Sequence, residues 1–443
     1  MFGVKAVTGL SFIFLFSIRP VLSQEQDCYS LKVTDFRDLN IFKLCSQKAS
    51  TDLKVRRELI RLIFKNPTLV SNDQKYTRFE SEKIFRDELL RLNRIKDIKS
   101  DDIQYAKLMI KFIAEHKFQN LFYALIGFLG NPVGELRDAA GKGIAILDDD
   151  RIYPILANML GSTDSLERTY AVNTIYHLKD ERTFDFLRGA IEDAEESIRY
   201  HAIESLLELN DPQSVKIFID LLENDPVVEV RRKSAQALGE IRSGSGYKAL
   251  TGALADSSRS LRSQVIQSMA RYKKVRSAAV FSRRLPEEES AKLKIEMIKH
   301  MLLLNNAGGG KGLYFLLKEE KNIEVLQWSI YAVGRLRLRG SVKELLNITR
   351  HKHAGIRSEA AMALKQLKST GSVNSLLDLL ENEQEIYQVR YSALLAIAAI
   401  NEPGAYPVLL DISIRTQNEF LKVKIQAVFQ QLLNNRYGRR LNR

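Results

Sequence analysis

Apolar and polar positions recur along residues 137–431 with a period of 31 to 34 residues. In each period a residue that is usually basic is followed by a small or apolar residue three positions later. A larger residue follows at seven positions, apolar in every period but the last. Spacings of three and seven lie on one face of an α-helix, so the pattern predicts one amphipathic helix per period. The first residue of each set, the register position, is Arg137, Arg168, Arg199, Arg231, Arg262, Lys294, Leu326, Arg357, Arg390 or Lys424.

A second apolar stripe precedes these helices. The segments 149–160, 181–191, 212–222, 341–348 and 372–380 open with polar or capping residues and continue with apolar ones. Asp, Asn, Ser and Gly lie between the paired stripes, where turns are expected. Each period is therefore a helical hairpin of about 31 residues, which cannot bury its apolar face alone. We predict an all-α fold, an α-solenoid of about ten stacked hairpins over residues 118–435, plus an N-terminal helical cap.

Several of these hairpins resemble HEAT repeats. The segments Val230–Ile241 and Ile356–Leu364 are similar to the second helix of the short, phycobilisome-lyase-type HEAT repeat. Tyr153-Pro154-Ile155-Leu156 and Tyr406-Pro407-Val408-Leu409 place a proline in the first helix, as that repeat often does. The resemblance covers roughly residues 118–435 and implies the fold. It says little about function, because such repeats occur in scaffolds, lyases, hydroxylases and nucleic-acid enzymes.

The remaining segments flank the repeats. Residues 24–117 are less regular and are interpreted as an irregular helical cap, with degenerate repeats as an alternative. Residues 436–443 form a basic C-terminal tail. Cys28 and Cys45, the only two cysteines, both fall in the cap and are a candidate disulfide in an exported chain. Free buried thiols are the alternative.

Residues 1–23 have the three-part pattern of a secretory signal. Lys5 provides a short basic region, Ala6–Ile18 is an apolar run, and cleavage is expected before Gln24. The run is too short to span the ~30 Å hydrocarbon core of a bilayer as a helix. A membrane anchor or a buried N-terminal helix is the alternative. We therefore expect an exported protein, periplasmic or secreted, without a transmembrane segment after signal cleavage.

Charge is distributed unevenly along the repeats. The 443-residue chain carries 67 Lys and Arg against 54 Asp and Glu. Residues 164–230 hold 6 basic and 16 acidic residues, whereas residues 259–353 hold 20 basic and 8 acidic ones. Such a field attracts acidic partners, which include proteins, glycans, phospholipid surfaces and nucleic acids. Of these we expect a protein partner with an acidic surface. Ordinary variation of surface charge, and self-association that pairs the two blocks, are the alternatives.

The resemblance to HEAT repeats implies that the second helices line the concave side of the solenoid. Positions two and nine residues after the register position face away from the apolar stripe. Trp328 and Arg335 lie there on one helical face and combine the aromatic and cationic groups that dominate interfaces. Packing of Trp328 between repeats is the alternative, and the register residues themselves are interpreted as structural. The candidate binding residues are Tyr170, His201, Lys233, Arg271, Trp328, Arg335, Arg337 and Arg339.

No catalytic constellation is found in the sequence. It lacks G-x-S-x-G, H-E-x-x-H and the His-Glu pairs of HEAT-type hydroxylases, and two cysteines exclude a multi-cysteine metal site. We predict no catalytic residue, metal or cofactor, and a non-enzymatic scaffold that binds protein through its concave face. One alternative is a lyase- or chaperone-like factor that acts on another protein, with His177, His201 and Glu208 as acid–base groups. The other is a nucleic-acid binder that uses residues 259–353, which the export signal argues against.

Overall fold

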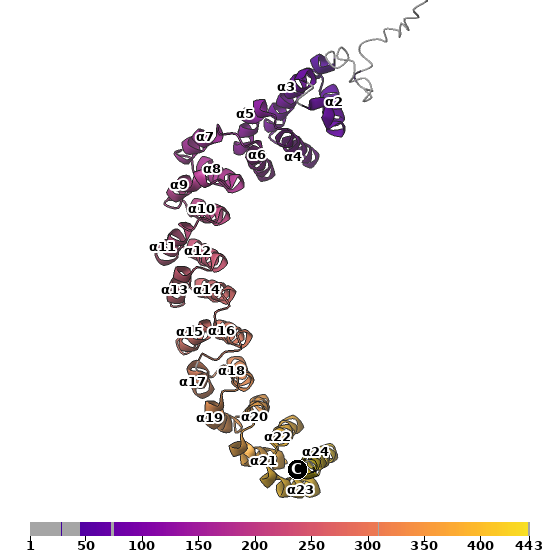
Figure 1. The fold of residues 1–443 in the computed structure, drawn as a ribbon, viewed down its shortest axis with the longest axis vertical. Coiled ribbons are helices and arrows are strands. Elements are labelled where there is room, and N and C mark those ends of the chain that lie inside the picture. Colours follow the sequence, from indigo (N-terminus) through magenta and orange to yellow (C-terminus); the bar gives the residue numbers. More distant parts are fainter. Residues whose placement is uncertain (1–27, 29–44, 72–74, 309, 442–443) are drawn as a thin grey trace, which may run out of the picture. The chain divides into compact units, whose positions relative to one another are not determined.

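The computed structural model describes Cys28 and residues 45–71, 75–308 and 310–441, and every regular element in these residues is a helix (Figure 1). The all-α fold expected from the periodicity is therefore confirmed. The expected signal segment 1–23 lies outside the described residues. The chain divides into two compact units, one up to Leu209 and one from Asn210 onward. Among the described residues, no helix combines the length and the apolar character that a membrane crossing requires.

Unit 1 consists of an N-terminal group of helices followed by hairpins in two layers. The N-terminal elements are α2 (Leu53–Lys65), η3 (Pro67–Val70), α3 (Lys75–Asn93) and α4 (Ser100–Glu115). The first helices of the hairpins are η4 (Gln119–Leu121) with α5 (Phe122–Ile126) and η5 (Gly127–Gly130), α7 (Ile152–Leu160), and η6 (Glu181–Thr183) with α9 (Phe184–Ala190). The second helices are α6 (Gly134–Leu147), α8 (Ser165–Leu178) and α10 (Glu196–Leu209), and α4, α6, α8 and α10 pack in succession.

Unit 2 continues the same alternation. Its first helices are α11 (Ser214–Asn224), α13 (Gly244–Ala253), α15 (Arg276–Arg284), α17 (Lys311–Glu319), η7 (Arg339–Ser341) with α19 (Val342–Ile348), η8 (Thr370–Ser372) with α21 (Val373–Glu381), and η9 (Pro403–Ala405) with α23 (Tyr406–Arg415). Its second helices are α12 (Val228–Ile241), α14 (Arg259–Arg271), α16 (Ala291–Leu303), α18 (Ile323–Arg335), α20 (Ala354–Leu367), α22 (Tyr387–Ile400) and α24 (Glu419–Leu441). The expected basic tail from residue 436 continues α24 as helix as far as Leu441.

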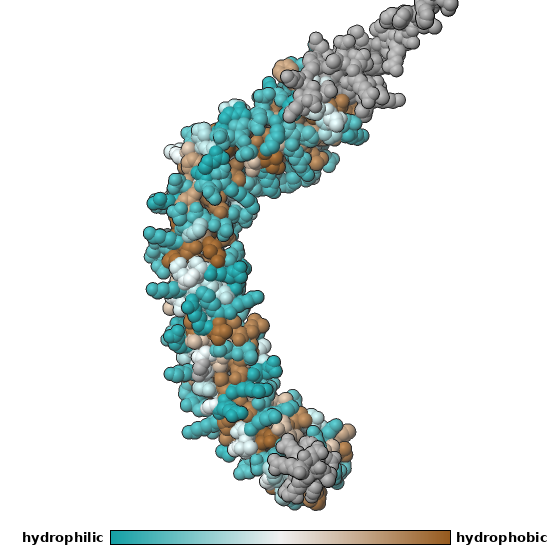
Figure 2. All heavy atoms as spheres, viewed as in Figure 1, coloured by the Kyte–Doolittle hydropathy of each residue, from teal (hydrophilic) through white to brown (hydrophobic). Residues whose placement is uncertain are grey.

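The core of each unit lies between the two layers of helices. On the face shown in Figure 2, apolar side chains gather along this seam and polar ones cover the edges. The residues three positions after the register position are all fully buried from the first period to the ninth, and most are small, which lets neighbouring second helices approach closely. They are Ala140, Ala171, Ala202, Ser234, Val265, Met297, Ser329, Ala360 and Ala393.

The last period was assigned to the wrong register. Lys424 and Ala427 are exposed, and so is Val423, whereas Leu421 and Ile425 are fully buried. The basic residue that follows a buried apolar one in α24 is therefore Lys422, two positions earlier than predicted. The error arose because α24 carries the exposed apolar residue Val423 besides its buried ones, so two apolar stripes of the same spacing compete in the sequence.

The register arginines connect successive hairpins, as their structural interpretation predicted. Arg262 is an example. Its Nη1 donates to the carbonyls of Asp256 and Ser257 (2.9 and 3.1 Å), and its Nε and Nη2 each donate to Glu288 at 2.8 Å. Glu288 in turn accepts from the N–H of Ser290 (2.9 Å) just before α16. The side chain thus holds its own inter-helix turn and the next one together.

The same arrangement recurs along both units. Carbonyls five and six residues earlier accept from Arg137, Arg168, Arg199, Arg231 and Arg357. Acids in the next turn pair with the register residue in Arg168–Asp193, Arg231–Asp256, Lys294–Glu320 and Arg357–Glu385. In unit 2 Leu326 interrupts the series, because an aliphatic side chain cannot form such a bond.

A second recurring feature closes the second helices from α4 to α22. Each ends at a residue with positive φ, and none of these is glycine. From α6 onward this residue lies eleven positions after the register position. Asn and Asp tolerate the left-handed conformation, and Lys or Arg at a helix C-terminus faces the negative end of its dipole. The residues are Lys117, Asp148, Lys179, Asn210, Arg242, Lys273, Asn305, Arg337, Lys368 and Asn401.

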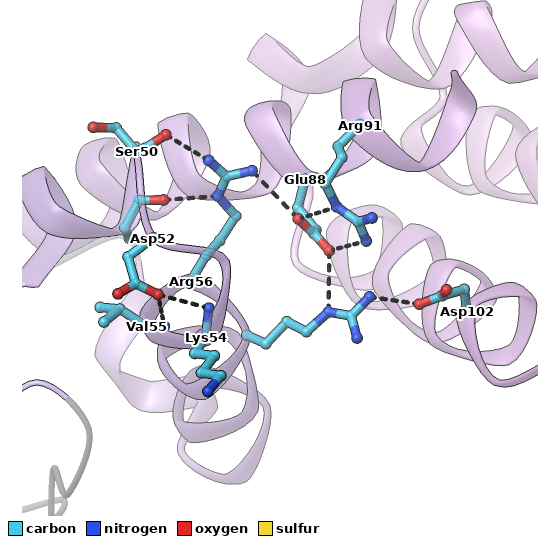
Figure 3. Close-up of polar contacts among 10 residues, drawn as sticks. Ser50, Asp52, Lys54, Val55, Arg56, Glu88, Arg91 and Asp102 are labelled. Atoms are coloured by element: carbon cyan, nitrogen blue, oxygen red, sulfur yellow. Dashed lines mark hydrogen bonds and ion pairs between the residues drawn. The ribbon is translucent and has the colours of Figure 1, made fainter. Parts of the chain in front are cut away.

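The N-terminal part of unit 1 uses the same chemistry (Figure 3). Arg56 of α2 donates to the carbonyls of residues 49 and 50 (2.8 and 2.7 Å), as a register arginine does. It also faces the fully buried Glu88 of α3 at 3.4 Å, together with Arg57 (3.6 Å) and Arg91 (2.6 Å). Three guanidinium groups therefore surround one carboxylate. This cluster joins α2 to α3 within the segment interpreted as a cap.

A disulfide near the N-terminus and a closely packed glycine in unit 2 each hold two segments of the chain together. A disulfide joins Cys28 to Cys45, whose Cα atoms lie 5.5 Å apart, and both residues are fully buried. In unit 2, before α17, Gly308 and Gly310 have positive φ values of +54° and +70°. Gly312 packs so closely on α15 that a Cβ there would lie 1.9 Å from the carbonyl oxygen of Ser282. That position therefore requires glycine.

Candidate binding surface

A groove of about 700 Å³ lies on three successive second helices of unit 2. We call it the Trp328 groove. Trp328 of α18 is half-buried in it, and Leu303 of α16 and Tyr331 of α18 are exposed beside it, at 79% and 42%. Exposed apolar groups around an aromatic side chain are typical of protein interaction sites. The lining residues are Lys299, Leu302, Leu303, Asn305, Gln327, Trp328, Tyr331, Arg335, Leu336 and Glu359.

Cations flank the indole ring of Trp328. Lys299 Nζ lies 4.7 Å from the ring centroid, a cation–π contact between α16 and α18, and the ring of Tyr331 meets Trp328 edge to face at 6.0 Å. Arg335 lies seven residues after Trp328 on the same face of α18 and lines the same groove. The structure thus brings together Trp328 and Arg335, as the sequence predicted. Trp328 both packs against the neighbouring repeat and remains accessible.

One carboxyl group lines the Trp328 groove. Glu359 of α20 is half-buried, and no hydrogen bond or ion pair to it occurs within the described residues. Burial raises its pKa above the ordinary value for glutamate.

A basic pocket of about 650 Å³ adjoins the Trp328 groove and shares Asn305, Arg335 and Leu336 with it. Arg337 lines this pocket, together with Lys365 and Lys368 of the next repeat. No carboxylate lines it. Arg339 is not part of either site, because the positive φ of Arg337 turns the chain and η7 then carries Arg339 towards the first helices. The complete lining of the basic pocket is Asn305, Gly334, Arg335, Leu336, Arg337, Lys365, Gln366, Lys368 and Ala399.

Tyr170 and His201 lie in a separate pocket of about 340 Å³ in unit 1, formed by η5, α6, α8 and α10. In it, His177 Nε2 is 2.9 Å from Asp138 Oδ1, and His201 Nδ1 is 3.1 Å from Glu204 Oε2. Burial lowers the pKa of His177, although Asp138 opposes this shift, so His177 favours the neutral form. Its remaining ring nitrogen can then accept a proton. We call this the His177 pocket.

The other predicted residues do not join these sites. Arg271 is exposed and pairs with Glu240 Oε1 at 3.0 Å, one repeat away. Lys233 is half-buried on α12 and lines none of the three pockets described above. Glu208, expected to act with His177 and His201, instead bonds Lys179 at 2.5 Å. The candidate residues therefore divide among separate surfaces rather than forming one continuous face.

Several lining residues were missed in the sequence. Leu303 occupies the position nine residues after Lys294, the same offset that identified Arg335, but an apolar residue there was not considered. Lys368 could have been found from the offset of eleven that marks the left-handed residues. Lys299, Lys365 and Glu359 have no signal of that kind. Within the described residues, no three His, Cys, Asp or Glu side chains are close enough together to hold a metal ion.

Stacked two-helix hairpins that share continuous cores define the class of this protein as an α-solenoid. The family model for HEAT repeats matches residues 154–232, 215–299 and 311–388, which together make up just over half of the chain. The chain belongs to the HEAT-repeat family. A comparison with curated proteins finds no match.

Solved structures share the fold at low sequence identity. Kap121p is 12% identical with a TM-score of 0.55, and the match covers 90% of this chain and 49% of that one. This chain thus spans about half the length of Kap121p. Importin beta is also 12% identical, with a TM-score of 0.45, covering 89% and 66% of the two chains. The complex of CpcE and CpcF of phycocyanin lyase from Nostoc sp. PCC7120 is 14% identical with a TM-score of 0.28, covering 56% and 94%.

Proposed function

We propose that this protein is an exported, non-enzymatic scaffold that binds a protein partner with an acidic surface through the second helices of unit 2. The observation that carries the proposal is the Trp328 groove. There a half-buried indole ring, two exposed apolar side chains and two cations lie on the consecutive second helices α16 and α18. Aromatic and arginine side chains contribute most of the binding energy at protein interfaces. Positive charge steers an acidic partner towards them.

Export rests on the sequence of residues 1–23, and the disulfide between Cys28 and Cys45 supports it. Disulfides persist in oxidising compartments and are rare in the cytosol. An exported scaffold has no access to nucleic acid in the cell, so we assign the basic groups of residues 259–353 to a protein partner.

The experiment is site-specific photo-crosslinking in the native cells. A photoreactive amino acid replaces Leu303 in the groove, and in a matched control it replaces Phe315, an exposed apolar residue on the first helix α17. We expect a protein adduct at position 303 only, in the exported fraction, on a chain that begins at Gln24. Trp328→Ala should reduce that adduct about tenfold or more, because truncating a central aromatic residue costs 2 kcal/mol or more.

Different results would contradict different parts of the proposal. Equal adducts at positions 303 and 315, or an adduct that Trp328→Ala leaves unchanged, would contradict binding in the groove. A nucleic-acid adduct would favour the alternative that uses the basic residues for phosphates. An uncleaved chain recovered from the cytoplasm would contradict export.

The His177 pocket favours a second candidate, a lyase- or chaperone-like factor that acts on another protein. A neutral histidine held by Asp138 can serve as a general base, and His201 with Glu204 lies in the same pocket. Recovery of the bound partner with and without His177→Gln tests this candidate. A chemical change in the partner that depends on His177 would support it, and an unchanged partner mass would contradict it.

A further inference from the structure

The cations of the basic pocket are not neutralised by the protein. Within the described residues Arg335, Arg337, Lys365 and Lys368 form no ion pair, and no carboxylate lines the pocket. Arg271 of the same unit, by contrast, pairs with Glu240 across repeats. Four positive charges at one site repel each other, so this pocket gains free energy when an anion enters it.

The fold explains only part of this charge. Arg337 and Lys368 are the left-handed residues that close α18 and α20, where a cation faces the negative end of the helix dipole. In the neighbouring repeats Asn305 and Asn401 hold the same position with the same backbone conformation. The turn therefore does not require a cation. Arg242 and Lys273 are also successive cations at this position, but there the neighbouring Arg271 pairs with Glu240. Beside Arg337 and Lys368, the neighbours Arg335 and Lys365 are cations without an ion pair among the described residues, and this accumulation of four charges favours an anionic ligand.

The basic pocket and the Trp328 groove are parts of one surface. Arg335, Leu336 and Asn305 line both, so a ligand that leaves the groove past Arg335 enters the pocket. Leu303, Trp328 and Tyr331 line the groove but not the pocket. Apolar contact is thus available at one end and positive charge at the other.

We propose that the Trp328 groove and the basic pocket together bind a short linear segment of the partner, in which a bulky apolar side chain is followed by two or more Asp or Glu residues. The apolar side chain lies against Trp328, Leu303 and Tyr331. The carboxylates bond Arg337, Lys365 and Lys368, with Arg335 between the two parts. This inference rests on the proposed function and specifies the chemistry of the segment that the scaffold binds.

The chain offers a direct spectroscopic test, because Trp328 is its only tryptophan. The purified protein is titrated with a synthetic peptide that carries one phenylalanine followed by three acidic residues, and indole fluorescence is recorded. One comparison peptide has Asn and Gln in place of the acids, and another has Ser in place of Phe. We expect a saturable change with the first peptide and at least tenfold weaker binding of the other two.

A double variant and its matched control test which cations bind the acidic residues of the peptide. Arg337→Asn with Lys368→Asn introduces the residue that neighbouring repeats use at the same backbone position, so the turns are preserved. This double variant should weaken the acidic peptide at least tenfold. Arg283→Asn with Lys292→Asn removes two exposed cations outside the site and should leave affinity unchanged. Glu359→Gln should tighten binding, because a neutral amide removes repulsion of the ligand's carboxylates.

The outcomes separate this inference from the proposed function. No fluorescence change up to millimolar peptide, with a folded protein by circular dichroism, would overturn the inference. Equal binding of the Phe-to-Ser peptide would also overturn it, because charge alone would then suffice. The inference would also be overturned if a second copy of the protein occupied the groove. That result would appear as concentration-dependent self-association that the peptide does not reverse. If the crosslink at position 303 persists in each case, the scaffold function stands with a partner of different chemistry.

Discussion

Replacing Arg262 tests whether the arginines between hairpins stabilise the stack. The side chain of Arg262 is 12% exposed, and that of its partner Glu288 is completely buried. Arg262→Ala leaves the carboxylate of Glu288 buried with the N–H of Ser290 as its remaining hydrogen-bond donor. Breaking a buried ion pair by removing one partner costs about 3–5 kcal/mol. We therefore expect Arg262→Ala to destabilise the junction of α14 and α16 by that amount.

Two controls separate the buried charge from other effects. Arg262→Met with Glu288→Met removes both charges and should recover most of the stability, since apolar replacement of a buried pair is often neutral. Arg232→Ala breaks an exposed pair with Glu229 on α12, whose side chains are 37% and 60% exposed. That variant should cost less than about 0.5 kcal/mol.

The assay is urea unfolding combined with hydrogen exchange of the amides in α14 and α16, because a repeat array can open locally. The reasoning is refuted if Arg262→Ala and Arg232→Ala lose the same stability. The dependence on pH gives an independent check. Burial raises the pKa of Glu288, but the hydrogen bonds from Arg262 and the Ser290 N–H outweigh burial, so the pKa lies below its ordinary value.

A carboxyl group with a lowered pKa in the folded state stabilises the protein above its unfolded pKa, near about 4.3 for glutamate. This contribution is lost as the pH falls through the folded pKa. In Arg262→Ala burial dominates and the pKa of Glu288 rises, so the sign reverses. The variant should then regain part of its stability, relative to the wild type, as the pH is lowered from 7 to 4. A constant difference across that range would contradict this account of Glu288.

Four further changes have expected outcomes that thermal or urea unfolding can measure. Gly312→Ala should lower the free energy of unfolding by about 3 kcal/mol or more, because the added Cβ meets the backbone of α15. Gly252→Ala should instead stabilise α13 by about 0.5–1 kcal/mol, because there is open space around Gly252. A similar loss in both would contradict the steric argument. Arg242→Gly should raise the free energy of unfolding by about 1 kcal/mol, because glycine adopts the left-handed conformation at this position without steric strain. A loss of stability would show that the arginine side chain contributes more than the strain costs. Cys45→Ser should destabilise the N-terminal helices by about 3 kcal/mol by opening the loop to Cys28, and an unchanged midpoint would count against the link.

The repeat architecture could be predicted because every hairpin solves the same packing problem. A residue such as Ala360 must be small, and Leu364 must be large and apolar, to fill the space between successive second helices. Both requirements recur in every period and add up along the sequence. The prediction failed at Lys424, because the exposed apolar residue Val423 precedes it and produces a second stripe with the same spacing as the buried one.

The binding surface was less predictable because it depends on contacts between repeats. That Trp328 and Arg335 share a surface could be predicted, because their offsets from the register position place them on one face of the same helix. Arg271 shares the offset of Arg335, yet Glu240 of the preceding repeat neutralises it. The left-handed backbone at Arg337 separates that residue from its close neighbour Arg339. Such pairing and such changes of chain direction are decided by the folded geometry, and no offset along the chain encodes them.

The interruption at Leu326 has a mechanical consequence. In unit 2 the second helices α12, α14, α16 and α20 are each tied to the following turn by an ion pair of their register residue, and within the described residues α18 has no such tie. We expect the missing ion pair to make the step from α18 to α20 easier to bend than it would be with such a pair, and both parts of the binding surface span this step. Load on the stack would then change the spacing of the groups that hold the ligand, so that affinity responds to tension.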